Sequence, residues 1–183
     1  DVALDSLNIH NNTNDGMYFG YNYNNSIFTV DSARIVDNGS NGVRFSRLES
    51  GSSLDIENAD IHDNDNIEVY VGYFQVGSGS DISVTKSKLY DDDGNWIVYA
   101  GYCCYSEMAG YNTDFRQNDW GETVTAEMNT GTNPQNISVI YDYYDYTYYY
   151  PFINYAGYVR ATGDTGYSGE VEIQDENGNM ISD

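Results

Sequence analysis

The chain has few basic residues, few prolines and cysteines, and no long apolar run. Lysine and arginine together number 7, against 29 aspartates and glutamates, which gives a formal net charge of −22 at pH 7. With so few cations there is no basic patch to displace counterions from phosphate, so nucleic acid is excluded as a partner. The acidity itself names no partner, because it also keeps a protein soluble outside a cell.

The two cysteines, Cys103 and Cys104, are adjacent, which leaves a vicinal bridge as the only disulfide possible within the chain. No segment approaches about 18 consecutive apolar residues, so direct membrane insertion is not expected. The sequence has no signal peptide and begins inside a repeat. We therefore expect a portion of a larger multidomain chain or assembly, located outside the cell or on its surface.

Aromatic side chains are abundant instead. The chain contains 20 Tyr, 6 Phe and 2 Trp. This aromatic area is enough to build a packed core, so the composition is not that of a disordered chain in spite of its charge.

One five-residue pattern recurs along the chain. An apolar anchor is followed three positions later by Asn or Asp, and the anchors are separated by 26, 26, 28 and 26 residues. The anchors are Ile9, Ile35, Ile61, Leu89 and Phe115. Seven and five residues before the anchors lie further apolar residues, with one glycine in the last copy, which is the period of a strand with one buried face. These two columns are Val2, Phe28, Leu54, Ile82 and Met108, then Leu4, Val30, Ile56, Val84 and Gly110.

Strands that recur in the same order once per repeat must pair in parallel with their copies, roughly 4.8 Å apart. We therefore predict an all-β, right-handed parallel β-helix (solenoid) of about five to six coils with a C-terminal cap. An antiparallel sandwich is the alternative, but it gives no reason for aligned copies at a constant spacing. The coils and cap are expected at residues 1–158. Residues 159–183 are expected to form a linker and the first strands of a following β-sandwich-like domain.

The repeat resembles that of the pectate-lyase-like parallel β-helix superfamily, which includes bacterial surface proteins, adhesins and polysaccharide-degrading enzymes. The resemblance covers roughly residues 1–158. It depends on an Asn-x-Trp-Gly element at residues 118–121, on an aromatic-Pro-aromatic segment at residues 150–152, and on the Asn or Asp three positions after each anchor. Those residues are Asn12, Asn38, Asn64, Asp92 and Asn118. The resemblance implies the C-terminal coils of a secreted or surface protein, but it says little about activity, because this scaffold carries many functions.

Acidic residues line up in rows when the coils are stacked. Asp37, Asp63 and Asp91 lie two positions after their anchors, and Asp92 and Asp93 follow directly. Oxygen-rich clusters suit Ca²⁺, which takes 6–8 oxygen ligands. No cofactor is required, but residues 91–95 are the first candidate for a calcium site and residues 175–179 the second. Solvated surface acids are the alternative for the first, and a hairpin turn is the alternative for the second.

Seven tyrosines fall within residues 141–150. Their alternation with aspartates suits a strand that packs one face on the last coil and leaves the other exposed. Exposed rings are favoured where a surface meets sugars or another protein, although these rings would also serve as the terminal cap that a solenoid needs. The candidate ligand-binding residues are Tyr141, Tyr143, Tyr144, Tyr146 and Tyr148.

Two function classes remain. The first is a non-catalytic structural or adhesive segment that binds a glycan or a partner protein. The second is a fragment of a polysaccharide lyase or glycoside hydrolase. Lyases of this fold need a basic residue, and bases are sparse here. The Asn-Thr-Asp run at residues 112–114 is similar to an element of polygalacturonases, but the Asp91-Asp92 pair precedes it instead of following it. We therefore predict the first class, with no catalytic residue.

Overall fold

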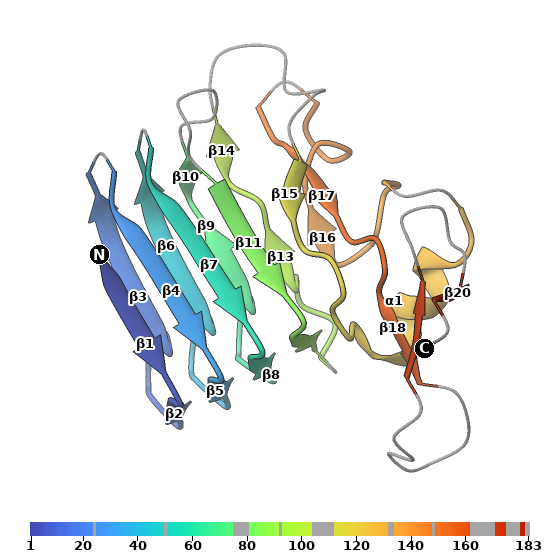
Figure 1. The fold of residues 1–183 in the computed structure, drawn as a ribbon, viewed down its shortest axis with the longest axis horizontal. Helices are drawn as coiled ribbons and strands as arrows, with labels where there is room; N and C mark the ends of the chain where they lie inside the picture. Colours follow the sequence, from blue (N-terminus) through green and yellow to red (C-terminus); the bar gives the residue numbers. More distant parts are fainter. Residues whose placement is uncertain are drawn as a thin grey trace.

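Each regular turn of the chain contributes one strand to each of three parallel sheets in the computed structural model (Figure 1). The result is the all-β parallel solenoid that the repeat predicted, and it has about three regular turns. The structure describes residues 1–23, 25–49, 51–74, 81–91, 93–103, 112–131, 134–147, 149–161, 171–174 and 180–181. The count of five to six coils and the C-terminal cap stay predictions.

The three sheets differ in strand length. Sheet A contains β1 (Val2–Asp5), β4 (Ile27–Asp31), β7 (Ser53–Glu57), β11 (Asp81–Thr85), β15 (Asn112–Asp114) and β17 (Phe152–Asn154). Sheet B contains the short strands β2 (Asn8–His10), β5 (Arg34–Val36), β8 (Asp60–His62) and β12 (Lys88–Tyr90). Sheet C contains β3 (Met17–Asn22), β6 (Val43–Leu48), β9 (Val69–Val71), β10 (Tyr73–Phe74), β13 (Val98–Tyr99), β14 (Tyr102–Cys103) and β16 (Ile140–Tyr141).

The register of the first four coils confirms the predicted columns. In sheet A, Val2 pairs with Phe28, Phe28 with Leu54, and Leu54 with Ile82. In sheet B the anchors pair in the same way from Ile9 to Leu89. Most of these side chains face inward and form one continuous apolar core.

The predicted alignment of the fifth repeat is wrong by five residues. Ser83 pairs with Asp114, an offset of 31 instead of 26, so Phe115 lies in the column of Val84 and not in that of the anchors. A bridge between Lys88 and Asp119 places Trp120 next after the fourth anchor. Phe115 and Trp120 are both fully buried. With the 26-residue spacing Phe115 would still be buried, but Trp120 would lie in the column of Asn14 and Asn66, which are exposed. The shifted register therefore buries both large side chains.

Single residues in the left-handed region turn the corners of the coils. Between sheets A and B these residues are Ser6, Ser32, Asn58 and Lys86, with φ of 51–55°. Between sheets B and C they are Asn11, Asp37 and Asp63, with φ of 54–56°. Asn and Asp tolerate this conformation better than most residues, which explains why the second corner repeats them. The corner directs these side chains away from the core.

The described residues after the regular coils form one helix and a small antiparallel sheet. Helix α1 (Gly121–Met128) packs Val124 and Met128 against the core. Strand β18 (Val159–Ala161) pairs antiparallel with β19 (Val171–Gln174), which pairs with β20 (Met180–Ile181). A separate domain at residues 159–183 stays a prediction. Within the described residues, no helix is long and apolar enough to span a membrane.

Candidate functional site

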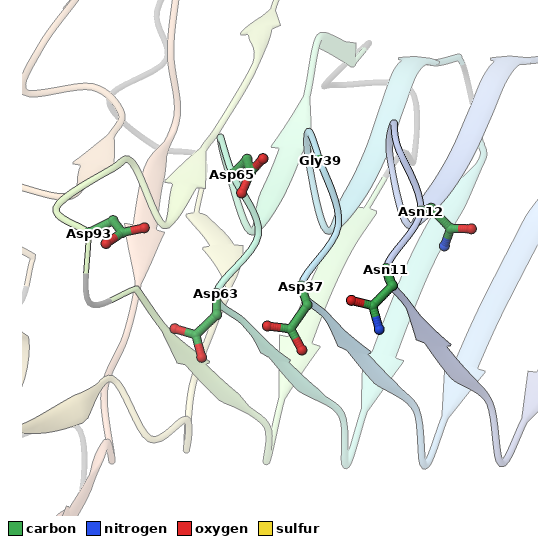
Figure 2. A pocket seen from close by; sticks show the side chains of 7 residues that line it. All are labelled: Asn11, Asn12, Asp37, Gly39, Asp63, Asp65 and Asp93. Atoms are coloured by element: carbon green, nitrogen blue, oxygen red, sulfur yellow. The ribbon is translucent and has the colours of Figure 1, made fainter.

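An acidic groove runs along the corner between sheets B and C. Its volume is about 580 Å³. Figure 2 shows Asn11, Asp37 and Asp63 at equivalent corners of three successive coils. The full lining consists of Asn11, Asn12, Asp37, Gly39, Asp63, Asp65 and Asp93. The stacking of coils therefore brings carboxylates that are 26 residues apart in sequence onto one surface.

The structure brings together three of the five predicted calcium ligands, Asp37, Asp63 and Asp93, in this groove. Asp91 lies beside it, and its Oδ1 accepts the backbone N–H of Asp93 at 2.7 Å, which closes a turn. Asp92 lies outside the described residues, as does the second candidate loop at 175–179. Within the described part of the chain, no group of three or more His, Cys, Asp or Glu side chains is arranged to hold a metal ion. Calcium binding stays a prediction.

A ladder of asparagines lies beneath the groove. Asn38 Oδ1 accepts both the backbone N–H and the Nδ2–H of Asn12, at 3.2 and 2.8 Å. Asn64 Oδ1 accepts the same two donors from Asn38, at 3.1 and 2.8 Å. Asn38 and Asn64 are both fully buried. In the first three coils, the residue three positions after the anchor therefore takes part in hydrogen bonds to backbone and side-chain donors at this corner.

The ladder ends on Glu68, a carboxylate with 0 % exposure. Glu68 Oε1 accepts the backbone N–H of Asn64 at 3.1 Å, and its Oε2 accepts the Asn64 Nδ2–H. Burial raises the pKa of Glu68 to about 8, although the two hydrogen bonds from Asn64 lower it. Asp91 and Asp63 raise it further by charge repulsion. The third coil thus contains an acid whose neutral form is favoured near pH 7.

A row of tyrosines and one arginine covers the outer face of sheet C. We call it the first Tyr–Arg row, and its members pair in successive rungs: Tyr18, Arg44, Tyr70, Tyr99 and Tyr141. The Arg44 guanidinium lies 5.5 Å from the ring centres of both Tyr18 and Tyr70. Tyr99 stacks on Tyr70 at 4.9 Å and on Tyr141 at 5.0 Å between ring centres. Each such contact stabilises the row by about 0.5–1.5 kcal/mol.

A second Tyr–Arg row runs beside the first and consists of Tyr21, Arg47 and Tyr73. The Arg47 guanidinium lies 4.4 Å from the ring centre of Tyr73, and its Nε lies 2.6 Å from Glu49 Oε1. Both rows therefore have the order Tyr, Arg, Tyr over the first three coils. Two arginines and the edges of several tyrosine rings therefore lie together on the outer face of sheet C, in a chain that is otherwise strongly acidic.

The predicted tyrosine cluster is only partly exposed. Tyr141 is half-buried in the first row, and Tyr143 is half-buried against Phe152, with 4.2 Å between ring centres. Tyr144 and Tyr146 are 38 % and 45 % exposed. Tyr148 lies outside the described residues.

A buried tyrosine joins this cluster to the first row. The Tyr99 and Tyr150 hydroxyls share a hydrogen bond of 2.6 Å. The Tyr150 ring packs edge-on against Tyr141 and Tyr146. Burial, together with this bond, raises the pKa of Tyr150 far above its ordinary value. The first row and the cluster are therefore one connected aromatic surface that ends at exposed Tyr146.

Neither the two Tyr–Arg rows nor the burial of Glu68 was predicted from the sequence. The rows had a signal, because Tyr18, Arg44 and Tyr70 are spaced by 26 residues and each lies between two apolar residues. Tyr21, Arg47 and Tyr73 have the same 26-residue spacing. Glu68 had no comparable signal, since an acid before a strand usually faces water.

Comparison of this chain with models of protein families, with curated proteins and with solved structures found no match.

Proposed function

We propose that this chain is a non-catalytic, adhesive β-helical segment of a secreted or cell-surface protein, and that its two Tyr–Arg rows bind a glycan chain. We also propose that it belongs with the surface proteins of the pectate-lyase-like superfamily. The observation that carries the proposal is the first Tyr–Arg row, a continuous aromatic surface over five rungs of sheet C.

The shape of this surface favours an extended ligand. Five rungs at strand spacing make a row about 19 Å long, which matches several sugar units in line. The ring faces within the row cover one another, so a ligand would meet ring edges, tyrosine hydroxyls and guanidinium N–H groups. These groups donate and accept hydrogen bonds, as sugar hydroxyls require. Tyr18, at the end of the row, is 60 % exposed, so a sugar ring can stack on it.

A polysaccharide lyase or glycoside hydrolase is the second candidate, and one observation favours it. Asp37, Asp63 and Asp93 line the same groove, and sugar hydrolysis commonly uses a pair of carboxyl groups. Glu68 has the raised pKa of a general acid, but it is fully enclosed, so it does not reach a substrate in the groove.

Affinity electrophoresis tests the proposal. The net charge of −22 drives the chain through a native gel, and a polysaccharide cast into that gel slows it if the two bind. Xylan, mannan, β-glucan and polygalacturonate serve as probes. We expect retardation by at least one of them without release of reducing or unsaturated sugars. Product release would favour the enzyme, and free migration through all four gels would count against glycan binding.

A further inference from the structure

Glu68 occupies a column that is glycine in the first two coils. Backbone pairing of Val43 with Val69 places Gly42 opposite Glu68. The pairing between the first and second coils places Gly16 opposite Gly42 in the same way. A Cβ on Gly42 would lie 2.8 Å from Asn64 Nδ2, because the asparagine of the following coil fills that space. In the third coil the Glu68 side chain fills it instead. In the first two coils, the backbone N–H and the Nδ2–H of the asparagine are accepted by the Oδ1 of the asparagine one coil later. In the third coil, the Glu68 carboxylate accepts the same two hydrogen bonds from Asn64.

Among the described residues, the charged groups that act on Glu68 are two aspartates. Asp63 lies on the same corner, and Asp91 follows β12 in the next coil. Within the described part of the chain, no Lys, Arg or His side chain forms an ion pair with Glu68. A negative charge on Glu68 is therefore desolvated and repelled, and only the N–H groups of Asn64 offset this.

We propose that Glu68 is a proton-dependent lock at the end of the asparagine ladder, which holds the third coil closed while its carboxyl group is protonated and lets that coil open more often once it ionises. The lock would connect the ambient pH to the stability of the wall of the acidic groove. It does not depend on any ligand of the Tyr–Arg rows.

The direction of the effect follows from the two states of the chain. The pKa of Glu68 is about 8 in the folded protein and has its ordinary value of 4.5 in the unfolded chain, so the folded state binds this proton more tightly. The stabilisation is fully present below about pH 4.5 and is lost as the pH rises through 8. Between these values the ratio of folded to unfolded chain falls roughly tenfold per pH unit. Asp142 has a pKa of about 6, so the window from pH 6.5 to 8 reports on Glu68.

The experiment compares the full chain with its Glu68→Gln variant between pH 6.5 and 8, with EDTA in every buffer to exclude bound cations. Urea unfolding gives global stability, and hydrogen exchange of residues 64–72 reports opening of the third coil. Gln loses one acceptor for Asn64, so the slope with pH is the readout and not the absolute stability. Asp65→Asn is the matched control, because Asp65 is an exposed acid on the same groove.

We expect the ratio of folded to unfolded chain to fall roughly tenfold per pH unit for the parent and for Asp65→Asn. For Glu68→Gln we expect this ratio to stay constant over the same pH range. The proposal would be overturned if stability fell with pH equally steeply in the parent and in Glu68→Gln. It would also be overturned if the stability of Asp65→Asn were as independent of pH as that of Glu68→Gln. If Glu68→Gln does not fold, the Glu68 carboxyl carbon of the parent is titrated by NMR. A midpoint above pH 6.5 supports the lock, and a midpoint at or below 6.5 overturns it.

Discussion

Asn64 donates two hydrogen bonds to Glu68 and accepts two from Asn38 through a single oxygen. All three residues are fully buried. The ladder therefore has a direction: Asn12 and Asn38 each donate to the asparagine of the following coil, and Asn64 donates to the carboxylate of Glu68 in its own, third coil.

Replacement of Asn64 by alanine should destabilise the protein by about 2–4 kcal/mol. The change leaves the Asn38 donors without their acceptor and removes the Nδ2–H that Glu68 Oε2 accepts, while the backbone N–H of residue 64 still donates to Glu68 Oε1. Each unsatisfied buried group costs about 1–3 kcal/mol. Asn12→Ala is the matched control. Asn12 is exposed and lies at the open end of the ladder, so its loss should cost less than about 1 kcal/mol. Urea unfolding of both variants measures the difference in stability. Equal losses of stability in the two variants would contradict the conclusion that the buried end of the ladder contributes more than the open end.

Gly42 should not tolerate alanine. The new Cβ would lie 2.7 Å from the Glu68 carbonyl oxygen and 2.8 Å from Asn64 Nδ2, and backbone cannot move away cheaply. Overpacking of this kind costs about 1–3 kcal/mol. At Gly20 the nearest atoms would be 3.9 Å away, on the Tyr18 side chain, so Gly20→Ala should be close to neutral. Thermal unfolding of the two variants is sufficient, and a neutral Gly42→Ala would contradict the packing described for this corner.

The regular coils could be predicted because their signal is periodic. The columns that contain Ile9 and Val2 repeat with constant spacing, and the register follows them through four coils. The fifth repeat could not be placed in this way. There the burial of Phe115 and Trp120 sets the register, and burial depends on contacts that a local spacing does not contain.

The candidate site was predicted in part. Asp37 and Asp63 come together as their rows indicated. Tyr143 does not remain exposed, because Phe152 of the following strand covers it, and that contact joins segments on either side of a turn. Glu68 is enclosed because Asn64 lies at the end of a ladder, a fact that appears only when the coils are stacked.

Asp142 gives a second pH effect that is separable from that of Glu68. Its Oδ1 accepts the Tyr144 N–H and its Oδ2 accepts the Ile153 N–H, but burial raises its pKa to about 6 from an ordinary 3.8. The folded state again binds the proton more tightly, so this stabilisation is lost as the pH rises from about 4 through 6. The loss amounts to about 3 kcal/mol.

The Asp142→Asn variant should lose this pH dependence. Its stability relative to the parent should rise by up to about 3 kcal/mol between pH 4 and 6.5 and change little above that. The new amide presents an N–H to one of the two backbone donors, which adds an offset that is independent of pH. Urea unfolding across this range provides the measurement, and parallel profiles for the two proteins would refute the assignment.

Calcium binding in the acidic groove is tested by thermal unfolding in EDTA and in 1 mM Ca²⁺. A site with a Kd of about 10 μM would stabilise the folded chain by about 2.7 kcal/mol at that concentration and raise its Tm. Asp37→Asn keeps the left-handed corner and removes one carboxylate, so it should reduce the shift. The same Tm with and without Ca²⁺ would reject the site.

The most direct test of glycan binding by the Tyr–Arg rows and the connected tyrosine cluster is the Kd of the chain for the polysaccharide that most retards the parent. Tyr18→Ala and Tyr146→Ala change exposed members at opposite ends of this surface, and Tyr23→Ala removes a ring that is 72 % exposed and belongs to neither row. We expect each of the first two variants to weaken binding roughly tenfold, equivalent to about 1.4 kcal/mol, and the Kd of Tyr23→Ala to stay within about twofold of the parent value. Equal affinities for all four proteins would contradict glycan binding by this surface.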